Sequence, residues 1–148
     1  MAALADDGAS MKVTNHLQPG DILDLLLSAI AASDLPATLA CFTLGTDVEV
    51  VGSEKGEQAR GRAAVESFFR RVYAKPQAYR FLLPTRALTI HRDVAWMVAD
   101  GSVTEPGDTQ SKPYRLTAVF VRDESGWRVA LWSGSEPVLR LPEARLER

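Results

Sequence analysis

The sequence contains one cysteine, Cys41, and two histidines in 148 residues. A single cysteine excludes a disulfide within the chain and fits a reducing compartment. Histidine and cysteine are the usual ligands of transition metals, and no metal-ligand spacing involves the few that are present. We therefore expect no metal site and no cofactor.

Long apolar runs and an excess of basic residues are also missing. No run approaches the roughly 18 apolar residues that a membrane-spanning helix needs. The first residues, MAALADDGASMKV, have neither the basic start nor the apolar stretch of a secretory signal. The formal net charge of −2 argues against a dedicated nucleic-acid binder, which would carry a basic face. We expect a cytoplasmic protein without membrane or nucleic-acid partners.

What the sequence does contain is one long β-hairpin over residues 112–138, KPYRLTAVFVRDESGWRVALWSGSEPV. Its two arms are rich in β-branched and aromatic residues. Between them the segment DESG supplies turn chemistry, with Gly126 free to take a positive φ. A hairpin this long needs other elements to cover one of its faces.

The rest of the chain predicts helices first and strands later. Asp21 is expected to cap a first helix and Asp34 a short second one, both at apolar repeats of helical spacing. We expect a third helix over residues 61–73, a loop over 53–60, and strands over 47–52, 79–91 and 94–104. This order predicts one α+β domain over residues 19–138, with tails at 1–18 and 139–148.

Several stretches carry a family resemblance: ASDL at 32–35, Cys41-Phe42 leading into Val48-Glu49, RGRAAV through Phe68-Phe69, and VFVRDESGWR at 119–128. With the element order, they resemble the nuclear transport factor 2-like superfamily, nearest to its SnoaL-like and ketosteroid-isomerase-like bacterial branches. The resemblance implies a cone-shaped cystatin-like fold, in which three N-terminal helices pack on a strongly curved antiparallel sheet around a pocket. That fold serves isomerases, dehydratases, polyketide cyclases and non-catalytic binding or assembly domains, so it leaves function open.

Steroid isomerisation needs a carboxylate base and two donors for the dienolate oxygen. The family's base position matches Val50, its two tyrosine positions match Leu26 and Phe69, and its oxyanion aspartic acid falls near Arg115. Three of these residues are apolar and the fourth has the opposite charge. The family's own isomerase mechanism is therefore not expected, and no His/Asp pair supports a polyketide cyclase.

The resemblance also implies which hairpin residues face the pocket. The inward set would be Arg115, Thr117 and Val119 on the first arm and Ala130, Trp132, Gly134 and Glu136 on the second. On the strand at 94–104, Trp96, Asp100 and Ser102 share one face, which alternation alone does not assign to the inside or outside.

Each candidate has a functional and a structural interpretation. Arg115 would anchor a carboxylate or phosphate, or pair with Asp100 or Glu136. Trp96 and Trp132 would stack on a planar ligand, or serve as core or dimer interface. Asp100 is the one candidate catalytic base, or a turn residue before Gly101.

Our first hypothesis is a pocket that binds a small hydrophobic, cyclic or aromatic molecule. Its proposed contacts are Leu26, Val50, Phe69, Trp96, Arg115, Thr117 and Trp132. One alternative is a non-catalytic dimerisation or assembly module. Another is an isomerase-, dehydratase- or cyclase-like enzyme that uses Asp100 and Arg115. In each case we expect a homodimer through the sheet.

Overall fold

A computed structural model describes residues 16–138 of the chain, and these residues form three helices and six strands. In chain order the elements are α2 (Pro19–Ala31), α3 (Leu35–Ala40), β1 (Glu49–Val51), β2 (Gln58–Arg60), α4 (Arg62–Tyr73), β3 (Arg80–His91), β4 (Val94–Thr104), β5 (Lys112–Asp123) and β6 (Gly126–Ser135). The predicted α+β class is confirmed. The predicted tails at 1–18 and 139–148 lie almost wholly outside the described residues.

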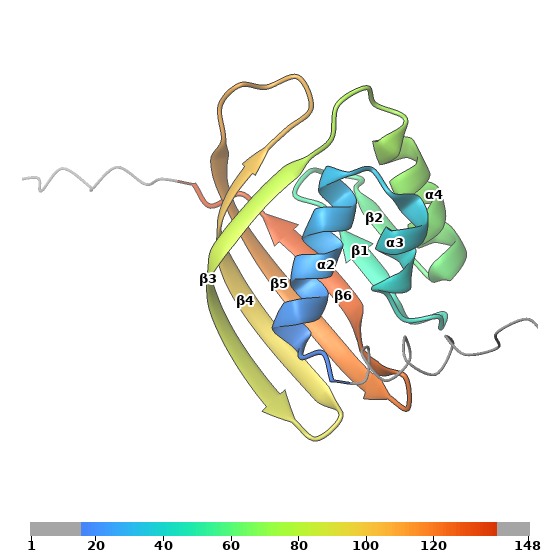
Figure 1. Cartoon of the computed structure of the whole chain (residues 1–148). Helices are drawn as coiled ribbons and strands as arrows, with labels where there is room; N and C mark the ends of the chain where they lie inside the picture. The colour runs from blue at the N-terminus through green and yellow to red at the C-terminus, as the bar shows by residue number, and fades with distance from the viewer. Residues whose placement is uncertain (1–15, 139–148) are drawn as a thin grey trace, which may run out of the picture.

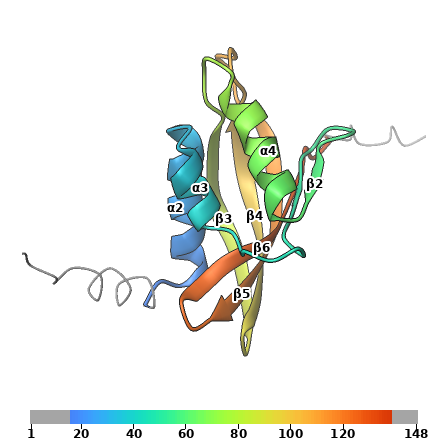
Figure 2. The ribbon, with the colours of Figure 1, turned by 90° about the vertical axis from the view of Figure 1, so that its right-hand side faces the viewer.

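The six strands form one sheet in the order β2-β1-β6-β5-β4-β3. Strands β3 to β6 pair antiparallel in sequence order, whereas β1 runs parallel to β6 with Val50 opposite Trp132. Figure 1 shows the sheet curving around α2, and Figure 2 shows α4 beside α3 with the long strands behind. The sheet is therefore the wall of a cone whose concave side is covered by helices.

The core lies between α2 and the concave face of the sheet. Leu23 and Leu26 of α2 are fully buried, and so are Leu116 and Phe120 of β5. This burial of apolar side chains is the main favourable contribution to folding. No helix within residues 16–138 is long and apolar enough to cross a membrane. The expected cytoplasmic location stays a prediction.

A bulge in the β5–β6 hairpin decides which side chains face inward. Gly126 closes the turn at φ 106°, as predicted, and the arms pair regularly as far as Phe120 with Val129. Val119 then pairs with Leu131, which leaves Ala130 unpaired. Because side chains alternate along a strand, one extra residue shifts every later pairing by one and exchanges the two faces.

Strand β3 contains a second irregularity, at Pro84. Its pairing with β4 shifts between Leu82 and Thr85. At this point the two strands approach so closely that a Cβ at Gly101 would overlap the carbonyl oxygen of Leu82. Glycine is therefore required at position 101 by lack of space.

Two local predictions were wrong. Helix α2 begins after Gln18, and Asp21 sits inside its first turn, where its carboxylate accepts the Gln18 N–H at 2.9 Å. Residues 53–60 are not a loop throughout, because β2 pairs Ala59 with Val50. A strand of three residues is too short for its alternation to be recognised in sequence. Asp34 does cap α3, since its side chain accepts the Ala37 N–H at 3.1 Å.

The substitution Gly101→Ala should lower the free energy of unfolding by about 1–3 kcal/mol, because the added methyl forces the β3 and β4 backbones apart. Urea denaturation followed by circular dichroism measures it. Gly20→Ala is the matched control: its Cβ, in the first turn of α2, would meet only the Arg86 side chain, at an ordinary contact distance of 4.0 Å, so it should leave stability unchanged or raise it by up to about 1 kcal/mol. Equal effects of the two substitutions would contradict the close approach at Gly101.

Candidate functional site

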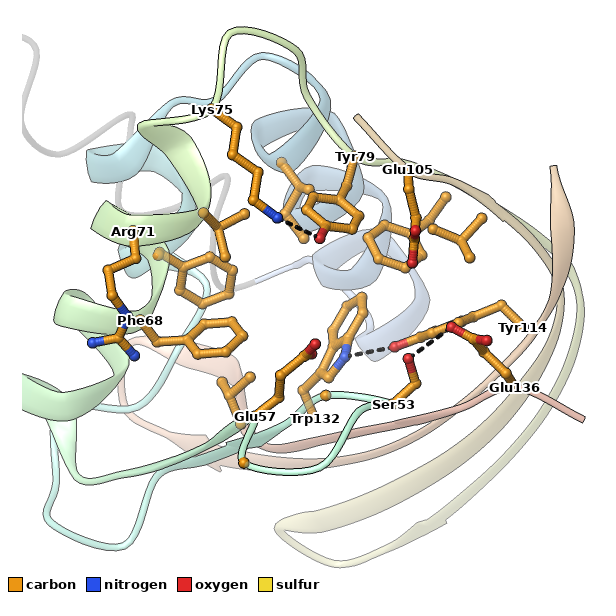
Figure 3. A pocket seen from close by; sticks show the side chains of 18 of the residues that line it. Ser53, Glu57, Phe68, Arg71, Lys75, Tyr79, Glu105, Tyr114, Trp132 and Glu136 are labelled. Atoms are coloured by element: carbon orange, nitrogen blue, oxygen red, sulfur yellow. Dashed lines mark hydrogen bonds between the residues drawn. The ribbon is translucent and has the colours of Figure 1, made fainter. Parts of the chain in front are cut away.

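A cavity of 370 Å³ opens between α4, the β1–β2 turn and the concave face of the sheet. Figure 3 shows its side chains from close by. The apolar and aromatic part of the lining is Ile30, Val50, Phe68, Phe69, Val72, Tyr79, Phe81, Val103, Tyr114 and Trp132. The polar part is Ser53, Lys55, Glu57, Arg71, Lys75, Glu105 and Glu136. The cavity thus combines an apolar interior with a charged mouth.

Aromatic rings form most of the interior wall and support one another. Phe81 packs edge-on against Trp132, with ring centroids 5.3 Å apart, and lies 4.9 Å from Tyr114. On the helix side Phe68 and Phe69 meet edge to face at 5.3 Å. Rings in such contacts are fixed before any ligand arrives. The pocket is therefore suited to a flat or ring-shaped apolar molecule.

One buried hydrogen bond places a donor inside this apolar wall. The Trp132 Nε1–H donates to the Tyr114 hydroxyl oxygen at 3.2 Å. Gly134 leaves space for that hydroxyl, since a Cβ there would overlap it. Burial raises the pKa of Tyr114 to about 12, so the phenol keeps its proton. No acceptor for that proton is found among residues 16–138, which leaves it free to bind a ligand oxygen.

The carboxyl group nearest the interior belongs to Glu57, in the turn between β1 and β2. It folds over Gly52, whose missing Cβ leaves it room, and Figure 3 shows it pointing into the pocket. Burial raises the pKa of Glu57, and the neighbouring Glu54 raises it further through its charge and a hydrogen bond. Glu57 is therefore a weaker acid than an ordinary glutamate.

At the mouth a second group of charges is paired internally. Lys112 Nζ lies 2.8 Å from Glu105 and 3.1 Å from Glu136, and Ser53 donates to Glu136 at 2.9 Å. These bonds lower the pKa of Glu136 and raise that of Lys112. They also join the β1–β2 turn to the ends of β4 and β6, and so fix the rim of the pocket.

The family of the chain follows from its sequence and agrees with this geometry. The family model of the SnoaL-like domain matches residues 20–139. The chain belongs to the SnoaL-like family. No match is found among curated proteins.

Solved structures share the fold of this SnoaL-like domain at low sequence identity. A candidate dehydratase of the nuclear transport factor 2-like family from Streptomyces avermitilis is 17% identical, covering 82% of this chain and 95% of its own, with a TM-score of 0.75. A candidate calcium/calmodulin-dependent protein kinase type II association domain from Thiobacillus denitrificans is 21% identical, covering 84% and 98%, with a TM-score of 0.74. A nuclear transport factor 2-like protein with a cystatin-like fold from Novosphingobium aromaticivorans is 16% identical, covering 98% and 94%, with a TM-score of 0.65. The expected SnoaL-like family is confirmed by the family model, and the expected cystatin-like fold is confirmed by the solved structures.

The structure brings together three of the residues expected in the SnoaL-like pocket. Val50 from β1, Phe69 from α4 and Trp132 from β6 all line the cavity. Leu26 does not, because it is fully buried in the core. Their predicted role in ligand binding stays a prediction.

The other four expected site residues lie on the outer face of the sheet, which corrects the predicted orientation. Arg115 and Asp100 form an ion pair at 2.8 Å there, with side chains 50% and 44% exposed. Thr117 and Trp96 are exposed on the same face. Pairing without the Ala130 bulge would have set Thr117 opposite Trp132, but the bulge sets Ala118 there instead. The structural alternative for Arg115, an ion pair with Asp100, is the one observed.

Sequence reasoning missed Tyr114, Glu57 and Lys75 as pocket residues. Tyr114 is adjacent to Arg115, so the same change of face that excluded one brought in the other. Glu57 was assigned to a solvent loop. The only sequence feature that pointed to Glu57 was its position five residues after Gly52, and many solvent-exposed loops have the same spacing.

Stability against pH should separate Glu57 from Glu136. A carboxyl group with a raised pKa is protonated more in the folded protein than in the unfolded one, so the unfolding free energy falls as pH rises above the ordinary value of 4.5. Glu57→Gln removes this loss, and the variant should gain stability relative to the parent between about pH 4 and pH 7.

Glu136→Gln should behave in the opposite way. The lowered pKa of Glu136 contributes stability above 4.5 that is lost as pH falls, so this variant should lose stability relative to the parent at neutral pH. Urea denaturation at four pH values measures both differences. Parallel profiles for the parent and Glu57→Gln would contradict the raised pKa.

Proposed function

We propose that this SnoaL-like protein binds a small hydrophobic molecule, cyclic or aromatic, in the pocket between α4 and the sheet. The observation that carries the proposal is the 370 Å³ cavity with six aromatic side chains in its lining. A cavity of this size is within the usual range for small-molecule sites, about 300–1,000 Å³. The polar contact with the ligand that was expected from Arg115 is made in this proposal by the Tyr114 hydroxyl.

Binding is better supported than the expected alternative of an enzyme that uses Asp100 and Arg115. Those two side chains neutralise each other on the outer face, on the side of the sheet away from the cavity. A ligand in the pocket would therefore be out of reach of both Asp100 and Arg115.

The proposal is tested by native mass spectrometry of protein purified without added ligand, then by calorimetry with ring compounds. A co-purified apolar molecule that is released on unfolding would support the pocket and identify its chemistry. Val72→Trp should abolish binding of every ligand found, because residue 72 lines the cavity and an indole would fill it.

Ala63→Trp is the matched control, since residue 63 is on the exposed side of the same helix. It should bind like the parent. A parent protein that carries no adduct and binds no ring compound would overturn the proposed function.

We also propose that two copies of the chain pair through the outer face of the sheet. Val94, Trp96 and Val98 on β4 are between 38% and 45% exposed and point to that face. Contiguous apolar surface of this kind marks protein–protein contacts in soluble proteins. Ligand binding and dimerisation use opposite faces of the sheet and are compatible.

Trp96→Glu should raise the dimer dissociation constant at least about tenfold, because it puts a charge in the centre of the apolar surface. Analytical ultracentrifugation measures the change. Ser67→Glu, on the exposed side of α4, is the control and should leave association unchanged. A parent protein that stays monomeric at high concentration would exclude the proposed dimer.

A further inference from the structure

The charges at the mouth of the pocket differ in how directly they are paired. Lys112, beside the lining, bridges Glu105 and Glu136. Within residues 16–138, the cations of the lining, Lys55, Arg71 and Lys75, have no carboxylate within ion-pair distance. The lining therefore has as many carboxylates as cations, but its cations are not held in direct ion pairs.

Lys75 is the most firmly positioned of these cations. Its ammonium donates to the Tyr79 hydroxyl at 2.9 Å and lies 4.9 Å from the centre of the Tyr79 ring. The hydrogen bond with Tyr79 raises the pKa of Lys75, so the charge is retained. Figure 3 shows this ammonium at the edge of the aromatic wall, beside the Tyr79 hydroxyl.

Arg71 precedes Lys75 by four residues and also lines the cavity, and Figure 3 shows its guanidinium beside Phe68, apart from the Lys75 ammonium. The Lys75 N–H bonds to the Val72 carbonyl at 3.3 Å, so the closing turn of α4 continues the helical spacing. Like charges four residues apart repel each other by a few tenths of a kcal/mol. The dipole of α4 favours cations at its C-terminal end, which accounts for Arg71 and Lys75 being there. It does not account for the fact that both line the same cavity.

The neighbouring Arg70 differs from Arg71 because it forms an ion pair within α4. It lies 2.7 Å from Glu66, one turn earlier on α4, and takes no part in the cavity. Arg70 and Arg71 share the helix end and its dipole, so only the position of their side chains separates them.

Three carboxyl groups face the two cations across the mouth. Glu105 and Glu136 are occupied by Lys112, and Glu57 is in the opposite turn. Burial and Glu54 raise the pKa of Glu57, while the charge of Lys75 lowers it, so Glu57 and Lys75 interact across the mouth without forming an ion pair. A ligand anion on the α4 side of the mouth would therefore meet cations that no carboxylate holds directly.

We infer that the pocket selects ring-containing carboxylates, with the ring system against the aromatic wall and the carboxylate held at the mouth by Lys75, while the charge of Arg71 adds to the attraction. This inference rests on the proposed function and specifies its ligand class. The Lys75 ammonium gives a carboxylate a charge-assisted hydrogen bond beside the aromatic wall. The fixed rim and preformed rings allow the carboxylate to bind without rearrangement of the wall.

The test compares each acid with its neutral amide, which has the same shape and lacks the charge. The probes are benzoate, 2-naphthoate and cyclohexanecarboxylate with the corresponding amides, titrated calorimetrically at neutral pH. The parent should bind at least one acid about tenfold more tightly than its amide. That preference should shrink as ionic strength rises, because salt screens the exposed cations.

The double variant Arg71→Gln/Lys75→Gln should lose the preference while its amide affinity stays within about twofold of the parent. An unchanged amide affinity shows that the pocket is still folded. Arg70→Gln removes one charge from the same helix end and should keep the full preference.

The outcomes distinguish the two proposals. Equal affinity of the parent for acids and amides, or a preference that survives in the double variant, overturns the carboxylate inference and leaves the pocket as a binding site. If the parent binds neither acids nor amides and cannot be told from Val72→Trp, the proposed function and this inference both fail.

Discussion

The wall of the pocket depends on one unpaired residue, Ala130, in the β5–β6 hairpin. Strand β5 alternates regularly and sets Tyr114, Leu116 and Ala118 on the concave face, with Arg115 on the outer face. The bulge in β6 brings Trp132 to the concave face, opposite Ala118. Without it, Trp132 would lie opposite Thr117 on the outer face, and the cavity would lose its indole.

Once that face is fixed, the wall of the pocket is assembled from parts of the chain that are far apart in sequence. Tyr114 and Trp132 meet across the hairpin, and Phe81 reaches them from β3. Two glycines, Gly134 and Gly52, leave space for the Tyr114 hydroxyl and the Glu57 carboxyl. Two of the polar groups in the cavity therefore depend on a glycine that leaves them space.

The mouth follows a different principle, because its groups are partly solvated. Lys112 links Glu105 and Glu136 and fixes the rim, which contributes order more than stability at such exposed positions. The cations at the end of α4 have no such link. A rigid rim beside unpartnered charge is what the selection of a charged ligand group requires.

The sequence by itself determined the fold class, because the helical repeats, the turn at Gly126 and the alternation of β5 are local patterns with strong physical preferences. The family resemblance also pointed to Val50, Phe69 and Trp132, which line the cavity, while their role in binding stays a prediction. Only the tertiary structure decided the side on which Tyr114 and Arg115 lie. A bulge has no clear sequence signal, and a shift of one residue exchanges the faces of a strand. The positions of Glu57 and Lys75 also depended on the tertiary structure. The β1–β2 turn and the end of α4 line a cavity only because the curved sheet lies opposite them.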